Sequence, residues 1–263
     1  MKKYWAFYRL GVQNAFTYRG PMLFWLIGNS LGMITMLAVW FSISGTGQIA
    51  GYTRNELLSY YVVSLFLSWI IGWYPFWIAQ NIKNGSIVGE ILLKPVSLYW
   101  RAFTADLAWH TISVFMAAVV VLTTWAFLKN YLVFNLDLFN LMLFVAASIV
   151  AIFVVFSAAV CISLLAFWLT ESNFTVNVFW AFMVVLGGHS LPITFLPGLV
   201  NTAAKILPFR YMFSFPMEIY FQKISSLEII YGFCVGVFWA CGLIYLYKFL
   251  WRRGVKIYSS WGQ

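Results

Sequence analysis

Ionisable residues inside the apolar stretches of this chain are few, and they are the first candidates for chemistry. Asp106 and His110 lie four positions apart, so a helix would place both on one face. A carboxylate and an imidazole inside a membrane are groups from which proton relays are built. A relay needs more such groups along the bilayer, and Ile112–Val121 carries none. We therefore interpret Asp106 and His110 as a structural pair or as an anchor at the membrane boundary.

Two further candidates lie toward the other end of the expected bilayer. His189 follows Gly187 and Gly188, where it fits either a gate on a substrate path or a histidine satisfied at the interface. Arg210 and Glu218 follow within a proline-rich segment. An intramembrane enzyme acting on lipid would need its catalytic residues to converge at one depth, and none of these pairs resembles a known reacting constellation.

No GxxxxGK[ST] phosphate loop and no HExxH or CxxC motif occurs in the sequence. The chain should therefore not hydrolyse ATP by itself, and we expect no catalytic residue, no metal and no cofactor. Lys and Arg outnumber Asp and Glu by 16 to 7. Basic residues commonly flank membrane spans, and no dense basic run or RNA-binding motif is present, so nucleic acid is not an expected partner.

The elements that position these residues are membrane helices. Hydrophobic residues make up 63% of the chain and charged residues 9%, whereas soluble domains carry about 25% charged residues. Since a span takes about 20 apolar residues, the sequence predicts an all-α membrane protein with six transmembrane helices. The predicted spans are Pro21–Ser44, Leu57–Ile78, Phe103–Leu128, Leu138–Trp168, Val176–Leu191 and Leu227–Leu250.

The whole chain, residues 1–263, is expected to be one domain: an interfacial helix (1–20), a six-span bundle (21–250) and a cytoplasmic tail (251–263). Most Lys and Arg residues fall on the side that holds both termini and the Asn81–Arg101 loop. The positive-inside rule makes that side cytoplasmic. We therefore expect a multi-pass protein of the bacterial plasma membrane with both termini inside the cell, in contact with membrane lipid.

Residues 2–19 show helical amphipathicity. The predicted apolar face is formed by Trp5, Tyr8, Val12, Ala15 and Phe16, and the opposite face by Lys2, Arg9, Gln13 and Thr17. Such a basic helix suits the membrane interface, although contact with a cytoplasmic partner is an alternative. Gly20 and Pro21 are expected to break it before the first span.

The polar Asn81–Arg101 loop between two apolar runs is the best functional lead. Ile87–Lys94 can form two short helical turns that stop before Pro95. Helical spacing would align Ile87, Ile91 and Lys94, with Glu90 beside Ile87 and Lys94. Together with Val88, these residues predict a compact plug for a partner; a solvated turn is the alternative.

The segment after the fifth predicted span stays apolar although it is rich in proline. Pro192, Pro197, Pro208 and Pro216 should divide it into short helices, which favours a re-entrant hairpin over an ordinary outer loop. Separately, Gly28 and Gly32 have the spacing that lets two helices approach closely, and they are candidates for packing in a dimer.

These features together resemble the permease subunits of ABC-2 type exporters. The stretch GSIVGEILLKPVSLYWR, with Gly89-Glu90 and Leu93-Lys94-Pro95-Val96, is similar to the first cytoplasmic loop of a subgroup once catalogued as a domain of unknown function. LPITFLPGLV (Leu191–Val200) and LPFRYMFSFPMEIY (Leu207–Tyr220) are similar to the outer segment of that subgroup.

The resemblance implies that two permease subunits, identical or different, pair in the membrane and dock onto two separate ATP-binding subunits. A coupling helix in the first cytoplasmic loop would sit in a cleft of the ATPase, and closure of the ATPase dimer would open the permease outward. The substrate would be exported, and the aromatic content of 21% is compatible with an amphipathic or lipid-like cargo. A membrane scaffold or assembly protein that needs no motor is the alternative.

Overall fold

The computed structural model describes residues 2–17, 19–43, 47–169 and 172–258, and every helix or strand element in these ranges is helical. Five elements are long: α2 (Arg19–Ser42), α3 (Arg54–Ile71), α5 (Leu98–Leu128), α6 (Leu138–Leu164) and α11 (Ser226–Ile257). The others are shorter: α1 (Lys2–Thr17), α4 (Trp77–Lys83), η1 (Val88–Leu92), η2 (Leu165–Phe167), α7 (Ser172–Leu186), η3 (Ile193–Phe195), α8 (Gly198–Ile206), α9 (Pro208–Met212) and α10 (Ser214–Tyr220).

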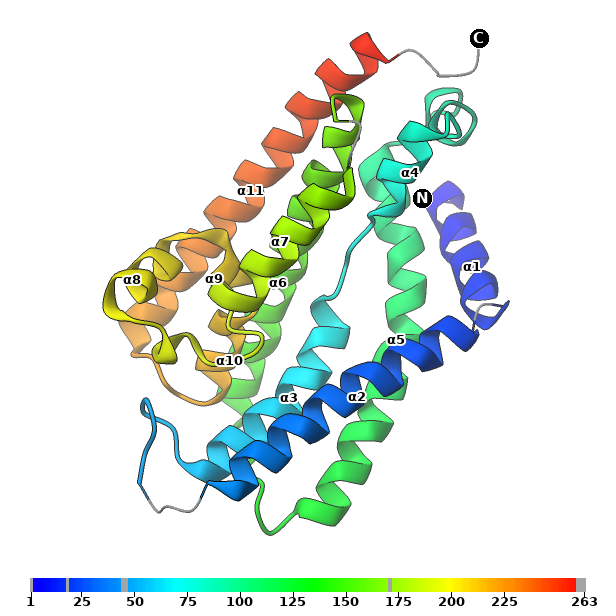
Figure 1. Cartoon of the computed structure of the whole chain (residues 1–263). Helices are drawn as coiled ribbons and strands as arrows, with labels where there is room; N and C mark the ends of the chain where they lie inside the picture. The colour runs from blue at the N-terminus through cyan, green and yellow to red at the C-terminus, as the bar shows by residue number, and fades with distance from the viewer. Residues whose placement is uncertain (1, 18, 44–46, 170–171, 259–263) are drawn as a thin grey trace.

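The helix α6 lies at the centre of the bundle and packs against α3, α9, α10 and α11 (Figure 1). Two thirds of its most apolar window is buried inside the protein, against 11–17% for α2, α5 and α11. Those outer helices expose large apolar side chains such as Phe24, Phe115 and Phe238. Apolar surface of this extent is not stable in water, and it identifies a multi-pass membrane protein.

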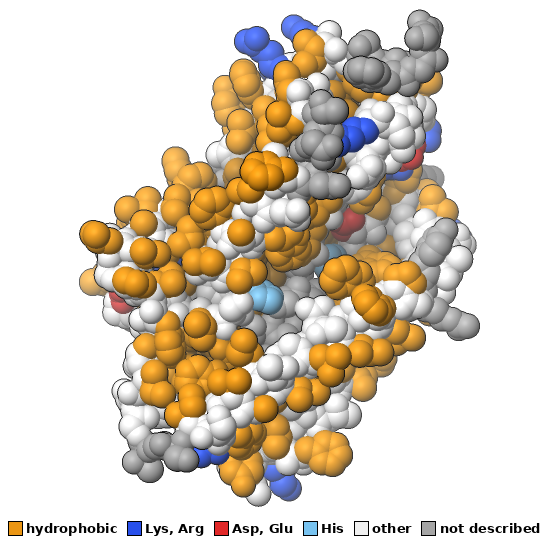
Figure 2. All heavy atoms as spheres, viewed as in Figure 1, with side chains coloured by type: hydrophobic (Ala, Val, Ile, Leu, Met, Phe, Trp, Pro, Cys, Tyr) orange, Lys and Arg blue, Asp and Glu red, His pale blue; other side chains and the backbone are white. Residues whose placement is uncertain are grey.

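The apolar surface has the layout of a protein that crosses a bilayer. Figure 2 shows hydrophobic side chains over most of one face, with Lys and Arg side chains toward its two ends. Among the residues that the structure describes, four helices are long and apolar enough to span a membrane: Leu23–Ser42, Leu98–Leu128, Leu138–Phe167 and Ser226–Ile257. The other two predicted spans correspond to α3 and to α7, which are shorter.

The second predicted span, Leu57–Ile78, was wrong as a continuous helix. Helix α3 ends at Ile71, and helix structure resumes only with α4 at Trp77. Gly72 and Pro75 lie in this break, and Pro75 has no N–H to continue the hydrogen bonding of α3. The first part of the predicted span is therefore α3, and its last part is an unwound link followed by the start of α4.

Helix α1 packs along α5 (Figure 1). An added Cβ at Gly11 would lie 2.8 Å from Cβ of Ala108, so the two helices approach as closely as glycine allows. The inward face carries Phe7 and Ala15, whereas Trp5 and Phe16, which we assigned to the apolar face, are 61% and 65% exposed. The amphipathic pattern thus serves packing on α5 on one side and leaves aromatic rings exposed on its flank.

Two predicted boundaries also shift. Helix α2 starts at Arg19 and runs through Gly20 and Pro21, because a proline in the first turn gives up no hydrogen bond that the helix would make. The last helix, α11, continues to Ile257. Residues 251–257 of the predicted cytoplasmic tail (251–263) therefore belong to this helix.

Candidate functional site

The loop between α4 and α5 lies at the same end of the molecule as the start of α1 and the end of α11 (Figure 1). It folds as the single π-turn η1 followed by a turn through Lys94–Val96. Ile87 and Ile91 are 0% and 3% exposed, in a core cluster with Trp73 and Leu98. The exposed side of the loop is formed by other residues: Gly89, Leu93, Lys94 and Pro95.

This arrangement corrects the plug predicted from the sequence. Ile87 and Ile91 cannot contact a partner directly, because the chain's own core already covers them. Val88 is half-buried in the same cluster. The outward apolar side chain is instead Leu93, which is 77% exposed. Glu90 does not pair with Lys94; its Oε2 lies 2.6 Å from Nη2 of Arg101 in α5.

Several contacts fix the loop to its surroundings. Lys3 Nζ donates to the Pro95 carbonyl (2.5 Å), and the Ser97 backbone N–H donates to the Tyr4 hydroxyl (3.3 Å). The Arg101 guanidinium also lies over the Phe7 ring, 5.4 Å from its centroid. These contacts make α1, the loop and the start of α5 one connected unit.

The proline-rich segment between α7 and α11 lies beside α6 (Figure 1). Pro192 and Pro197 directly precede η3 and α8, and Pro208 and Pro216 fall in the first turns of α9 and α10, where a proline costs little. Every residue of α10 is buried. The α9–α10 part of the segment is therefore packed protein, whereas α8 is largely exposed.

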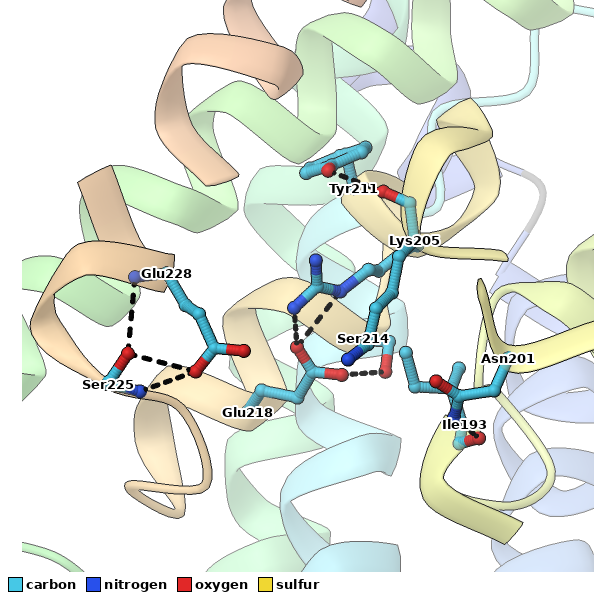
Figure 3. Close-up of polar contacts among 9 residues, drawn as sticks. Ile193, Asn201, Lys205, Tyr211, Ser214, Glu218, Ser225 and Glu228 are labelled. Carbon is cyan, nitrogen blue, oxygen red and sulfur yellow. Dashed lines mark hydrogen bonds and ion pairs between the residues drawn. The ribbon is translucent and has the colours of Figure 1, made fainter. Parts of the chain in front are cut away.

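An ion pair holds this segment together (Figure 3). Arg210 Nη2 and Nε lie 2.7 and 3.1 Å from Glu218 Oε2, and Ser214 donates to the other carboxylate oxygen at 3.2 Å. The two charged side chains are 3% and 5% exposed. Burial disfavours the charge of Arg210, but the adjacent Glu218 raises the pKa of Arg210 above its ordinary value. The contacts indicate an ion pair that stabilises the fold rather than a pair that takes part in a reaction.

Helix α3 holds the start of this segment through hydroxyl groups. Tyr60 donates to the Gly188 carbonyl (2.5 Å) and Tyr61 to the Ser190 carbonyl (2.8 Å). Ser68 Oγ lies 3.2 Å from Nε2 of His189. Gly188 adopts φ +81°, a conformation that favours glycine. The link after α7 is thus fixed against α3 at several points.

A cavity of about 660 Å³ lies between α2, α3, α5 and α7. On the face drawn in Figure 2 the surface is hollowed, and histidine side chains are visible in the hollow. The lining residues are Trp25, Asn29, Ser68, Trp69, Gly72, Tyr74, Asp106, Trp109, His110, Trp180 and His189. The structure therefore brings His189 to the same cavity as the Asp106 and His110 pair.

Asp106 and His110 do not bond to each other in the described structure. The His110 ring stacks on Trp73 at 4.7 Å, and its Nδ1 lies 2.9 Å from the Trp69 carbonyl. Because a carbonyl only accepts, Nδ1 carries the proton, and Nε2 of the neutral ring is an acceptor. Asp106 takes part in none of the ion pairs among the described residues. Nothing in the spacing of the sequence places His189 near them.

Two pairs of glycines four positions apart lie in long helices, Gly28 and Gly32 in α2 and Gly232 and Gly236 in α11, and their surroundings differ. A Cβ at Gly232 or Gly236 would meet Phe215 or Val150, so these residues allow α11 to pack closely within the chain. At Gly28 and Gly32 no described atom lies within 4 Å of an added Cβ. The face of α2 that carries them is open. The same stretch has the spacing G-x-S-x-G, but it lies inside a helix, and the Ser30 hydroxyl donates to the Leu26 carbonyl, so it is not a nucleophile turn.

No group of His, Cys, Asp and Glu side chains that could hold a metal ion occurs in the described ranges. Residues 27–262 match the protein-family model described as "ABC-2 family transporter protein". No curated protein and no solved structure matches the chain.

Proposed function

The chain belongs to the ABC-2 family of transporter proteins, and on that premise we propose that it is the permease subunit of an ABC exporter, driven by ATP hydrolysis on a separate subunit. The match across residues 27–262 carries the proposal, since it covers nearly every helix of the bundle. Membership accounts for a membrane transport component that is not itself catalytic and that associates with an ATP-binding subunit.

We place the docking site for the ATP-binding subunit on the α4–α5 loop. Its exposed side, with Leu93 and Lys94, is a small apolar and basic surface. Its buried side, with Ile87 and Ile91, ties it to the core. A push on such a loop would be transmitted to α5 through the Glu90–Arg101 ion pair. A loop that is exposed on one side and fixed on the other suits this role.

The proposed assembly has two permease subunits, identical or paired with a sister permease, and two ATP-binding subunits. In it the chain crosses the plasma membrane six times, with α3 and α7 as the two shorter spans and both termini in the cytoplasm. The open face of α2 at Gly28 and Gly32 would pack against the second permease. The buried α9–α10 pair would form a re-entrant hairpin in the outer leaflet, its backbone covered by α6.

The docking site is tested with Leu93→Asp and with Leu199→Asp as a matched control. Leu199 lies in α8 and is 90% exposed, so both changes add a carboxylate at an exposed leucine, one in the α4–α5 loop and one in α8. Each variant is co-expressed with the candidate ATP-binding subunit and purified through a tag on the permease. We expect Leu93→Asp to reduce recovery of the ATPase at least tenfold and Leu199→Asp to leave it unchanged.

A loss in neither variant would refute docking at this loop, and an equal loss in both would show that the effect is not local. Failure of every candidate ATP-binding subunit to co-purify with the unchanged chain would refute the proposed function itself.

A further inference from the structure

The polar side chains that line the cavity between α2, α3, α5 and α7 include several acceptors beside indole N–H and hydroxyl donors, and none of them is Lys or Arg. Asp106 has no ion-pair partner among the described residues, and its carboxyl group is hydrogen-bonded to the Trp77 side chain. The Nε2 atom of His110 is an acceptor because Nδ1 donates to the Trp69 carbonyl. The NH₂ group of Asn29 donates one hydrogen bond to the Trp25 carbonyl (2.8 Å), which leaves its amide oxygen as an acceptor and its second N–H as a donor.

His189 supplies one further acceptor and one donor. The Ser68 hydroxyl donates its single proton to the Ser64 carbonyl (2.7 Å), so at the contact with His189 the Ser68 oxygen accepts. Nε2 of His189 therefore carries the proton in the neutral ring, and Nδ1 is the acceptor. The lining residues include no Lys or Arg. The nearest basic side chain on α5, Arg101, is occupied by Glu90 and lies over the Phe7 and Trp77 rings.

The rest of the wall is aromatic. The lining rings besides the histidines are Trp25, Trp69, Tyr74, Trp109 and Trp180. The faces of tryptophan and tyrosine rings attract cations, most strongly where water is excluded. A cavity of about 660 Å³ falls within the size range of small-molecule sites, which combine apolar walls with a few oriented polar groups. Aromatic rings around one carboxyl group and several acceptors complement a positive charge on an apolar body.

We infer that this cavity binds an amphiphilic organic cation, with its ammonium or similar cationic centre held at Asp106 and its apolar body between the tryptophan rings. The inference rests on the proposed function, because it names the class of substrate that the permease would carry. Trp25 at the rim is 62% exposed on the face of α2. A ligand of this class partitions into the membrane and reaches the cavity from there.

The test uses two ions of the same shape and opposite charge, tetraphenylphosphonium and tetraphenylborate. Binding to the full chain in lipid nanodiscs is measured by equilibrium dialysis against empty nanodiscs, without any ATPase. The variant is Asp106→Asn. The control is Asp137→Asn, the same change at an exposed helix N-cap, where Asn accepts the hydrogen bond from Asn140 as well as Asp does.

We expect the unchanged chain to bind the phosphonium at least tenfold more tightly than the borate. Asp106→Asn should remove this preference by weakening phosphonium binding about tenfold or more while borate binding persists, and Asp137→Asn should leave both unchanged. Persisting borate binding also shows that the cavity of the Asp106 variant is intact.

Three results would overturn the inference: no binding of the phosphonium, equal binding of the two ions by the unchanged chain, or an equal loss of both ions in Asp106→Asn. Equal binding would point to a cavity filled by lipid chains without regard to charge. Because the assay contains no ATPase, its result is independent of the docking experiment. A chain that binds the cation but recruits no ATP-binding subunit would retain the site and lose the proposed function.

Discussion

The buried ion pair between Arg210 and Glu218 allows the sharpest prediction about stability. Replacing Glu218 by Gln keeps the size of the side chain and an acceptor for Ser214, but leaves the Arg210 guanidinium without its counter-charge. Arginine cannot shed its proton in a protein, and this one is only 3% exposed. Breaking a buried pair in this way costs about 3–5 kcal/mol. For a chain of this size we expect Tm to fall by about 6 °C or more.

Arg210→Met should cost less. It leaves the Glu218 carboxyl, which can take up a proton and remain hydrogen-bonded to Ser214. The double variant Arg210→Met, Glu218→Leu removes both charges, and replacement of a whole buried pair by apolar side chains is often close to neutral. We therefore expect the double variant to be more stable than Glu218→Gln alone.

The assay is thermal aggregation of purified protein in detergent, followed by size-exclusion chromatography of the heated samples. Lys223→Met serves as a comparison, because it breaks a pair with Glu56 whose side chains are 19% and 22% exposed, where an ion pair contributes less. If Glu218→Gln lowers Tm no more than Lys223→Met, or if the double variant is the least stable of all, the Arg210–Glu218 ion pair does not stabilise the fold in the way described.

Two further substitutions probe the packing of the helices. Gly11→Ala puts a Cβ 2.8 Å from that of Ala108 and should destabilise the protein by about 1–3 kcal/mol. Gly20→Ala is the control, because its added Cβ meets no described atom within 4 Å. Equal Tm values of the two variants in the same heating assay would refute close α1–α5 packing. Tyr60→Phe removes the donor to the Gly188 carbonyl and leaves a buried acceptor unsatisfied, at a cost of about 1–3 kcal/mol. It should also speed proteolysis near residues 187–191; unchanged cleavage there would contradict the tether.

The long helices could be predicted from the sequence because a bilayer imposes a length and a composition on each span. The end of α5 at Leu128 and the start of α6 at Leu138 match the predicted boundaries. The break after α3 could also have been found, since Gly72 and Pro75 are visible in the sequence. It was missed because the residues between them, Trp73 and Tyr74, are as apolar as a span requires.

The candidate sites depended on contacts that no local pattern contains. Helical spacing placed Ile87 and Ile91 on one side of the loop, but only the packing of Trp73 and Leu98 decides that this side faces inward. The partner of Glu90 proved to be Arg101, eleven positions away, rather than the residue one helical turn along.

The cavity shows the same limit more strongly, because its residues come from four helices and from the links that follow two of them. The sequence marked Asp106, His110 and His189 as unusual groups in apolar surroundings. It could not reveal that they face one space, since that depends on how α2 and α7 are placed relative to α5.

The interruption between α3 and α4 lies at the level of the cavity, and Gly72 and Tyr74 of this link are part of its wall. An unbroken helix would transmit a displacement of the α4–α5 loop directly to the far end of α3. The break between Ile71 and Trp77 would instead bend first. Under the coupling proposed for the α4–α5 loop, motion that begins at this loop would change the shape of the cavity before it reached the Arg210–Glu218 ion pair.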